Sequence, residues 1–264
     1  FRIITGTAFV SNDMGWIQLH LPDDGTVEVE DETDSLGCLG LWGPGSRRVL
    51  EAVSDSDLSN AAFPFMTARY ISVNDATVWA QRISYVGELG WELYIKPEDC
   101  LAVWDALMAA GSEFGIQAAG YKALDALRIE KGYLYWSTDI TPADNPLEAG
   151  LGMFVCLDKA DFNGRQALSK LKNQGLDSRI MALTLNAGGL LYGGESVYSD
   201  ERLVGRVRSG NYGHTIGQDI GLVYLPLEVA TAGTELKVEV MGERIAATVA
   251  DLPLVDPAGA KLRV

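Results

Sequence analysis

Apolar residues recur at the spacing of one helical face in three stretches of the chain. The stretches are residues 9–21, 97–111 and 121–131. Polar residues lie between the apolar positions, as expected of helices that pack one face on a core. The pattern therefore predicts three amphipathic helices in the first half of the chain.

Strand patterns lie between these helices. Residues 36–42 form an apolar run interrupted by glycine, which predicts a buried strand. Residues 70–73 and 78–83 flank the turn residues Asn74 and Asp75, which predicts a β-hairpin. Strands mixed with helices in this way predict an α+β domain. The pattern also indicates strands at 1–7, 27–30 and 91–95, and a short helix at 46–53.

The pattern changes after residue 168. Residues 170–177 are polar and contain a glycine, which predicts a linker. Short strands separated by glycine-rich turns follow, and their regular spacing predicts a β-barrel or sandwich. We therefore expect two domains, residues 1–172 and 173–264. The strands expected in the second are 180–185, 204–208, 221–225, 236–240 and 244–249.

Composition narrows the classes of function. The 264 residues include 21 basic and 36 acidic side chains, for a net charge of −15, and 47% are hydrophobic. This composition is that of a globular protein, and its acidity argues against a nucleic-acid or anionic-membrane partner. No apolar run approaches the roughly 18 residues of a membrane span. The three cysteines are widely spaced, which excludes a disulfide scaffold, and no cluster of metal ligands is apparent.

Residues 82–94 contain the densest group of candidate functional side chains. Trp91 and Leu93 alternate with Glu92 and Tyr94, so the second pair shares a face if the first pair faces a core. A buried carboxylate on that face needs hydrogen-bond donors. A flat heterocycle with two adjacent N–H groups is one such partner, because it matches both carboxylate oxygens. By itself, the pattern fits a solvated glutamate on an exposed strand face more often.

Two further clusters permit structural interpretations. Asp125 and Arg128 stand three residues apart on a predicted helix, where a structural ion pair is the better interpretation. Residues 138–152 combine prolines and glycines with acidic residues, typical of a long, fixed loop. A functional loop and a connection between domains are equally compatible with it. No phosphate-binding glycine motif is present, so nucleotide binding is unsupported.

Residues 85–94, Tyr-Val-Gly-Glu-Leu-Gly-Trp-Glu-Leu-Tyr, closely resemble the signature of the aminomethyltransferase (glycine-cleavage T-protein) family. The similarity is to the variant fused to dimethylglycine and sarcosine dehydrogenases. It extends over essentially the whole chain and implies a T-protein-like folate-binding domain, truncated at its N-terminus, followed by a C-terminal β-barrel. The other similar blocks are 120–132, 146–151, 157–159, 162–165, 210–213 and 253–257.

The resemblance implies tetrahydrofolate-dependent one-carbon transfer. The donor would be an aminomethyl group, or the methylene or formaldehyde unit of an oxidised N-methyl amine of the dimethylglycine or sarcosine type. In the family's arrangement, Glu92 would hold the amide and amino edge of the pterin, and Tyr85 would line the same pocket. Leu93 and Tyr94 follow Glu92 in the contact strand, and Gly6 would lie against the folate through its backbone.

Other family features lie outside this sequence or differ in it. The family's catalytic aspartate belongs to a strand upstream of Phe1, so no catalytic residue is expected here. We expect the chain to be roughly the last two thirds of a folate domain, with any flavin in a separate upstream oxidase domain or subunit. Leu124 replaces an arginine of the glycine-cleavage members, a departure that affects one folate contact.

Two alternatives to the enzyme stay open, and the missing aspartate is compatible with the enzyme and with the first of them. One is a non-catalytic folate-binding module of the iron–sulfur assembly type, which a reactive exposed cysteine would favour. The other is a fragment that is inactive in isolation. The family implies a location in the bacterial cytoplasm or the mitochondrial matrix.

Overall fold

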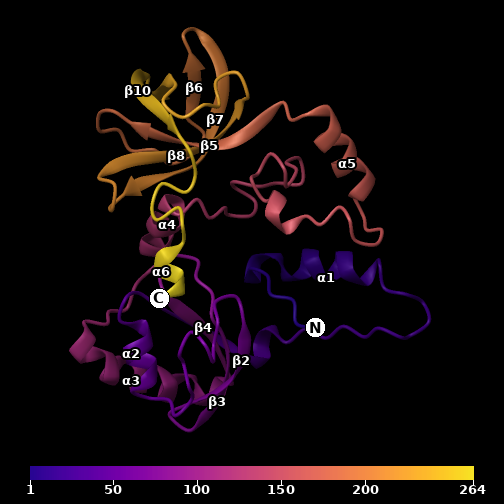
Figure 1. The fold of residues 1–264 in the computed structure, drawn as a ribbon, viewed down its shortest axis with the longest axis vertical. Helices are drawn as coiled ribbons and strands as arrows, with labels where there is room; N and C mark the ends of the chain where they lie inside the picture. Colours follow the sequence, from indigo (N-terminus) through magenta and orange to yellow (C-terminus); the bar gives the residue numbers. More distant parts are fainter. The chain divides into compact units, whose positions relative to one another are not determined.

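The computed structural model describes residues 1–264, which divide into two compact units. The first unit comprises residues 1–83 and 89–117, and the second comprises residues 84–88 and 118–264. Each unit has its own hydrophobic core. Figure 1 shows the elements of both units along the chain. No helix is both long and apolar enough to cross a bilayer.

The first unit is built on a four-stranded antiparallel sheet with the strand order β1-β4-β3-β2. The predicted hairpin is confirmed: β2 and β3 pair, and Asn74 and Asp75 turn the chain with φ values of 46° and 66°. Such left-handed turn residues suit a tight hairpin. The strands are β1 (Gly37–Trp42), β2 (Ala68–Val73), β3 (Ala76–Gln81) and β4 (Gly90–Ile95).

One face of this sheet packs on two helices. Val49 of α2 (Ser46–Glu51) and Leu107 of α3 (Cys100–Gly111) belong to the same core cluster as Trp91 and Leu93 of β4. Trp91 and Leu93 are fully buried, while Glu92 and Tyr94 are only half-buried. The predicted alternation is therefore confirmed, and it places Glu92 and Tyr94 on the face opposite the core.

The N-terminal segment differs from its prediction. The strand expected at residues 1–7 is wrong: residues 1–6 have no regular structure, and a short 3₁₀ helix, η1 (Thr7–Phe9), leads into α1 (Val10–Gln18). The strand expected at residues 27–30 is wrong too. Alternating apolar residues form a strand only where a neighbouring strand supplies hydrogen bonds, and neither segment has one. The helix predicted within 9–21 is confirmed.

The second unit contains a closed barrel of antiparallel strands in the order β10-β5-β8-β7-β6-β9. Closure removes the free edges that an open sheet exposes. The predicted barrel is confirmed, although β6 has four residues and gave no recognisable pattern. The strands are β5 (Ser178–Leu185), β6 (Ser196–Ser199), β7 (Arg202–Gly213), β8 (Gln218–Pro226), β9 (Glu235–Val240) and β10 (Glu243–Ala250).

Three helices accompany the barrel: α4 (Tyr121–Glu130), α5 (Arg165–Gln174) and α6 (Ala260–Arg263). The linker predicted at residues 170–177 is partly wrong, because α5 occupies its first half. The two lysines and the glutamine of this segment are good helix formers, and they lie on the solvent face of a surface helix. Gly175, with φ of 89°, ends that helix. The domain boundary between residues 172 and 173 stays a prediction.

Candidate functional site

The outer face of the first unit's sheet, opposite the core, brings the predicted residues Glu92 and Tyr94 together. The Tyr94 hydroxyl donates a hydrogen bond to Glu92 Oε2 at 2.7 Å. Burial and this bond raise the pKa of Tyr94, so the phenol stays protonated and remains a donor. Tyr94 thereby fixes the orientation of the carboxylate.

Residues from both neighbouring strands complete this surface, which we call the Glu92 face. Gly40 of β1 and Gln81 of β3 are the register partners of Glu92. Cys38 is the register partner of Tyr94 on the β1 side. The sequence pattern did not indicate Cys38 or Gln81, because their position depends on strands that are far apart in sequence.

Aromatic rings frame the Glu92 face. The Trp42 ring lies beside Gly40, where a β-carbon would come within 2.4 Å of it, and its Nε1 donates to the Ile83 carbonyl at 3.0 Å. The Trp79 ring lies 5.1 Å from the Tyr94 ring. The Arg2 guanidinium lies over the Trp79 ring, 4.4 Å from its centroid. Flat aromatic rings on the same sheet face as a carboxylate suit a planar heterocyclic ligand.

The cysteine on this face is not activated. Surrounding protein atoms and the Glu92 carboxylate raise the pKa of the Cys38 thiol to about 11. At neutral pH the sulfur is therefore a protonated thiol and a weak nucleophile.

The remaining predicted residues take different positions. The Leu93 side chain is fully buried in the core, so only its backbone is available to the Glu92 face. Gly6 is exposed and lies before η1, where its carbonyl accepts a hydrogen bond from the Phe9 amide at 2.8 Å. Contact of either residue with folate stays a prediction.

Tyr85 belongs to the second unit. Its hydroxyl donates to the Leu134 carbonyl at 2.8 Å, and its ring lies 5.9 Å from that of Tyr133. Burial raises the pKa of Tyr85 to about 12. The turn that follows needs glycine: Gly87 has φ of 76°, and a β-carbon there would come within 2.7 Å of the Lys131 side chain.

The predicted pair of Asp125 and Arg128 is confirmed as part of a buried network. Arg128 is 3% exposed and contacts Asp125 at 2.7 Å, Ser209 at 2.8 Å and the fully buried Asp139. Asp139 belongs to the loop at 138–152, so this ion pair fixes the start of that loop. The arrangement supports the structural interpretation of the pair.

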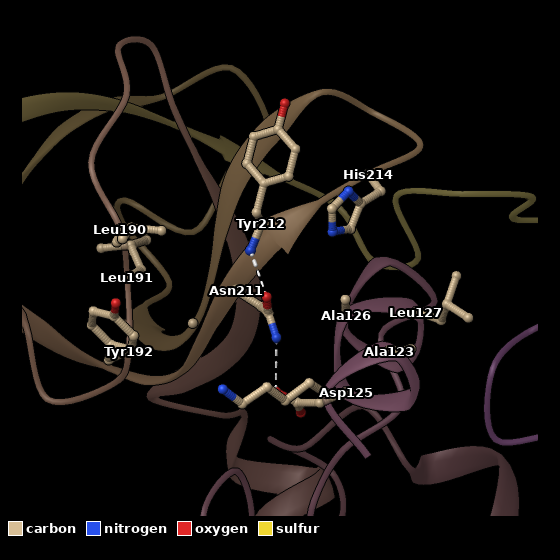
Figure 2. Close-up of a pocket in the computed structure, with 12 residues that line it drawn as sticks. Ala123, Asp125, Ala126, Leu127, Leu190, Leu191, Tyr192, Asn211, Tyr212 and His214 are labelled. Carbon is tan, nitrogen blue, oxygen red and sulfur yellow. Dashed lines mark hydrogen bonds between the residues drawn. The ribbon is translucent and has the colours of Figure 1, made fainter. Parts of the chain in front are cut away.

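A cavity of about 730 Å³ lies in the second unit, between α4, the segment around Tyr192 and the end of β7 (Figure 2). Asn211 stands at its centre: its amide donates to Asp125 at 2.9 Å and its carbonyl accepts from the Tyr212 amide at 2.8 Å (Figure 2). None of the five predicted folate contacts lines this cavity.

Known proteins resemble the chain over both units. Residues 1–159 match the family model of the GCVT N-terminal domain. Residues 179–256 match that of the glycine cleavage T-protein C-terminal barrel domain.

Sequence relatives and a solved structure agree with these matches. Mitochondrial dimethylglycine dehydrogenase of Rattus norvegicus is 41% identical over 97% of the chain, which spans 30% of that protein. An aminomethyltransferase of Halothermothrix orenii is 35% identical over 97% of the chain and 70% of its own length. The chain also matches the crystal structure of glycine cleavage system aminomethyltransferase T from Bartonella henselae, with a TM-score of 0.82 and 24% sequence identity. The match covers 98% of the chain and 68% of the chain in that crystal structure. The fold, the two family models and the relatives lead to one conclusion: the chain belongs to the aminomethyltransferase (glycine-cleavage T-protein) family.

Proposed function

We propose that the chain binds tetrahydrofolate on the Glu92 face and takes part in transfer of a one-carbon unit to it. The observation that carries the proposal is the Glu92 carboxylate, half-buried on a sheet face framed by aromatic rings and oriented by Tyr94 at 2.7 Å. A carboxylate held in this way is complementary to a ligand edge with two parallel N–H donors.

The residues of this face fit a pterin. An ionised carboxylate has about four acceptor positions on its two oxygens. Its bond to Tyr94 uses one of them, so Glu92 can still accept from the pterin's amide and amino groups together. Tetrahydrofolate, when bound, supplies a secondary amine, N5, as the nucleophile.

The chain's own task is to bind and orient. Glu92 and Tyr94 hold one edge of the ligand, while the rings of Trp42 and Trp79 border the face. Correct positioning of two reactants can lower the activation free energy by roughly 7–11 kcal/mol. We assign no general acid or base to this chain, and the Cys38 thiol beside Glu92 is not an activated nucleophile.

The donor side of the reaction is also a proposal. The relatives include a dimethylglycine dehydrogenase, so we propose an oxidised N-methyl amine of that type, or of the sarcosine type, as the one-carbon source. The chain spans about a third of that relative's length, and we propose an upstream flavin oxidase domain or subunit as its partner. We also propose a location in the mitochondrial matrix or the bacterial cytoplasm, a proposal supported by a relative that is mitochondrial and another that is bacterial.

Calorimetric titration of the 264-residue chain with tetrahydrofolate tests the proposal. Substituting Glu92→Gln turns one acceptor into a donor that faces donors, and we expect the affinity to fall by roughly 10- to 100-fold. The exposed Glu98→Gln, with the same change of charge, is the matched control and leaves the affinity unchanged. Equal affinities of the wild type and Glu92→Gln would overturn the proposal.

The iron–sulfur assembly alternative draws no support from the Glu92 face. It calls for a reactive exposed cysteine, and the raised pKa of Cys38 makes that thiol unreactive at neutral pH.

A further inference from the structure

Gln81, the last residue of β3, is one of several residues that hold a buried polar side-chain atom without a hydrogen-bond partner. Its Nε2 is sealed from solvent and has no hydrogen-bond partner within the chain. The large majority of buried side-chain donors in proteins have a partner, so an unpaired one calls for an explanation.

The neighbours of Gln81 explain why its amide is unpaired. On one side its register partner is Ala68 of β2, whose methyl group offers no hydrogen bond. On the other side its register partner is Glu92 of β4. Side chains that are directly opposite in an antiparallel sheet share a face, with β-carbons roughly 4.5–5.5 Å apart. Glu92 Oε2 accepts a hydrogen bond from the Tyr94 hydroxyl. The Gln81 amide nitrogen does not donate to either oxygen of the carboxylate.

The Glu92 face thus presents an acceptor and, immediately beside it, an unused donor. The edge of a folate pterin presents, in order, the 2-amino donor, the N3–H donor and the 4-oxo acceptor. If Glu92 accepts from the first two groups, the next group on the edge requires a donor beside Glu92. The terminal torsion of a glutamine is broad, so its amide can turn toward a ligand at small cost.

We propose that Gln81 donates a hydrogen bond to the 4-oxo group of the bound pteridine. The inference rests on the proposed folate function and adds a residue that sets the specificity. Gln81 favours 2-amino-4-oxo-pteridines over 2,4-diamino-pteridines, because the latter place an amino donor opposite the amide N–H, and the amide has to exchange its N–H and C=O ends to accept from that donor. Unpaired polar groups in a binding site are an effective means of rejecting such analogues.

The test compares two ligands on the full chain: tetrahydrofolate and its reduced 2,4-diamino analogue. In Gln81→Met, which keeps the side-chain length and removes the donor, we expect tetrahydrofolate to bind about tenfold more weakly. The analogue should bind as well as before or better, so the ratio of the two dissociation constants shifts by about tenfold or more. Gln117→Met, at an exposed position, is the control and leaves both constants unchanged.

A purely structural role for Gln81 would weaken both ligands by the same factor, and an unchanged ratio therefore overturns the proposal. Glu92→Gln separates the two hypotheses. If it weakens tetrahydrofolate binding while Gln81→Met leaves the ratio unchanged, only the specificity role fails. If neither variant changes tetrahydrofolate binding, the proposed function fails as well.

A measurement on the wild-type chain keeps the proposal testable if Gln81→Met does not fold. In a ¹⁵N-labelled sample, the assigned side-chain amide signals of Gln81 should shift when tetrahydrofolate is added, while those of Gln117 stay in place. A Gln81 amide that does not respond to the saturating ligand overturns the proposal.

Discussion

Two glutamates in this chain have opposite surroundings. Glu130, at the end of α4, is 2% exposed and accepts hydrogen bonds from the Thr215 amide at 2.6 Å, the Thr215 hydroxyl at 2.7 Å and the Ile216 amide at 3.2 Å. Glu92, on β4, is half-buried and accepts one, from Tyr94. Both oxygens of Glu130 are thus bonded within the chain, whereas Glu92 uses only one of its acceptor positions.

The contrast extends to the neighbours of each glutamate. Lys131, next to Glu130, is 7% exposed, and its ammonium bonds to Asp256 and to two backbone carbonyls. Gln81, opposite Glu92, has a buried amide nitrogen with no partner. Buried polar groups normally have hydrogen-bond partners. We therefore interpret Glu130 and Lys131 as structural, and Glu92 and Gln81 as part of a ligand site. If the contrast is correct, substitutions in the two clusters should affect different quantities.

The largest effect is expected from breaking the buried ion-pair network of Arg128. Arg128→Met leaves the fully buried Asp139 without its cationic partner, and loss of one member of a buried ion pair costs about 3–5 kcal/mol of folding free energy. Denaturant unfolding measures it. Arg202→Met, which breaks the exposed pair with Glu228, should cost at most about 1 kcal/mol. Comparable losses in the two variants would contradict the structural interpretation.

Alkaline pH should destabilise the fold through its buried tyrosines. Burial raises the pKa of Tyr85 to about 12, so above pH 10 the unfolded chain loses this proton while the folded chain keeps it. Stability from this group is complete below about pH 10 and declines as the pH rises toward 12, by up to about 1.4 kcal/mol per pH unit. The free energy of unfolding of Tyr85→Phe should therefore fall less steeply between pH 10 and 12. An identical slope in both proteins would refute the assignment.

The two glutamates themselves can be exchanged for glutamine. Glu130→Gln places a side-chain N–H against the N–H and O–H donors of Thr215 and Ile216. This should lower the free energy of unfolding by about 1–3 kcal/mol. Glu92→Gln should leave the unfolding free energy within about 0.5 kcal/mol of the wild type and weaken tetrahydrofolate binding instead. Thermal or denaturant unfolding, run beside calorimetry, measures both quantities. A Glu92→Gln variant that loses stability but not affinity would place both residues in the same structural class.

Local sequence patterns were sufficient to predict much of the fold and the side of β4 on which Glu92 lies. The alternation of Trp91 and Leu93 with Glu92 and Tyr94 assigns the two faces of β4, because side chains point to opposite faces with a period of two. The hairpin and the barrel follow from turn residues and regular strand spacing. The alternation and the hairpin are signals within a few consecutive residues, and the barrel is indicated by how such signals repeat along the chain.

The errors and omissions have a different origin. The strand expected at 27–30 had the right alternation but no pairing partner, and a strand needs one. The polar stretch predicted as a linker is half helix, since polarity alone does not separate a solvated helical face from a loop. Gln81 and Cys38 reach Glu92 and Tyr94 because β4 inserts between β1 and β3. That strand order is a long-range property, and no local pattern contains it.

The smallest of the predicted effects tests how Glu92 is oriented. Tyr94→Phe removes the donor at 2.7 Å and leaves the ring, so the carboxylate keeps its position on the strand but loses its fixed rotamer. We expect tetrahydrofolate affinity to fall by roughly two- to tenfold, the value of one hydrogen bond of about 0.5–1.5 kcal/mol. Combined with Glu92→Gln, the loss should be less than the sum of the two single losses, because Tyr94 acts through Glu92. Additive losses in this double-mutant cycle would mean that the Tyr94 hydroxyl contacts the ligand independently of the carboxylate it bonds.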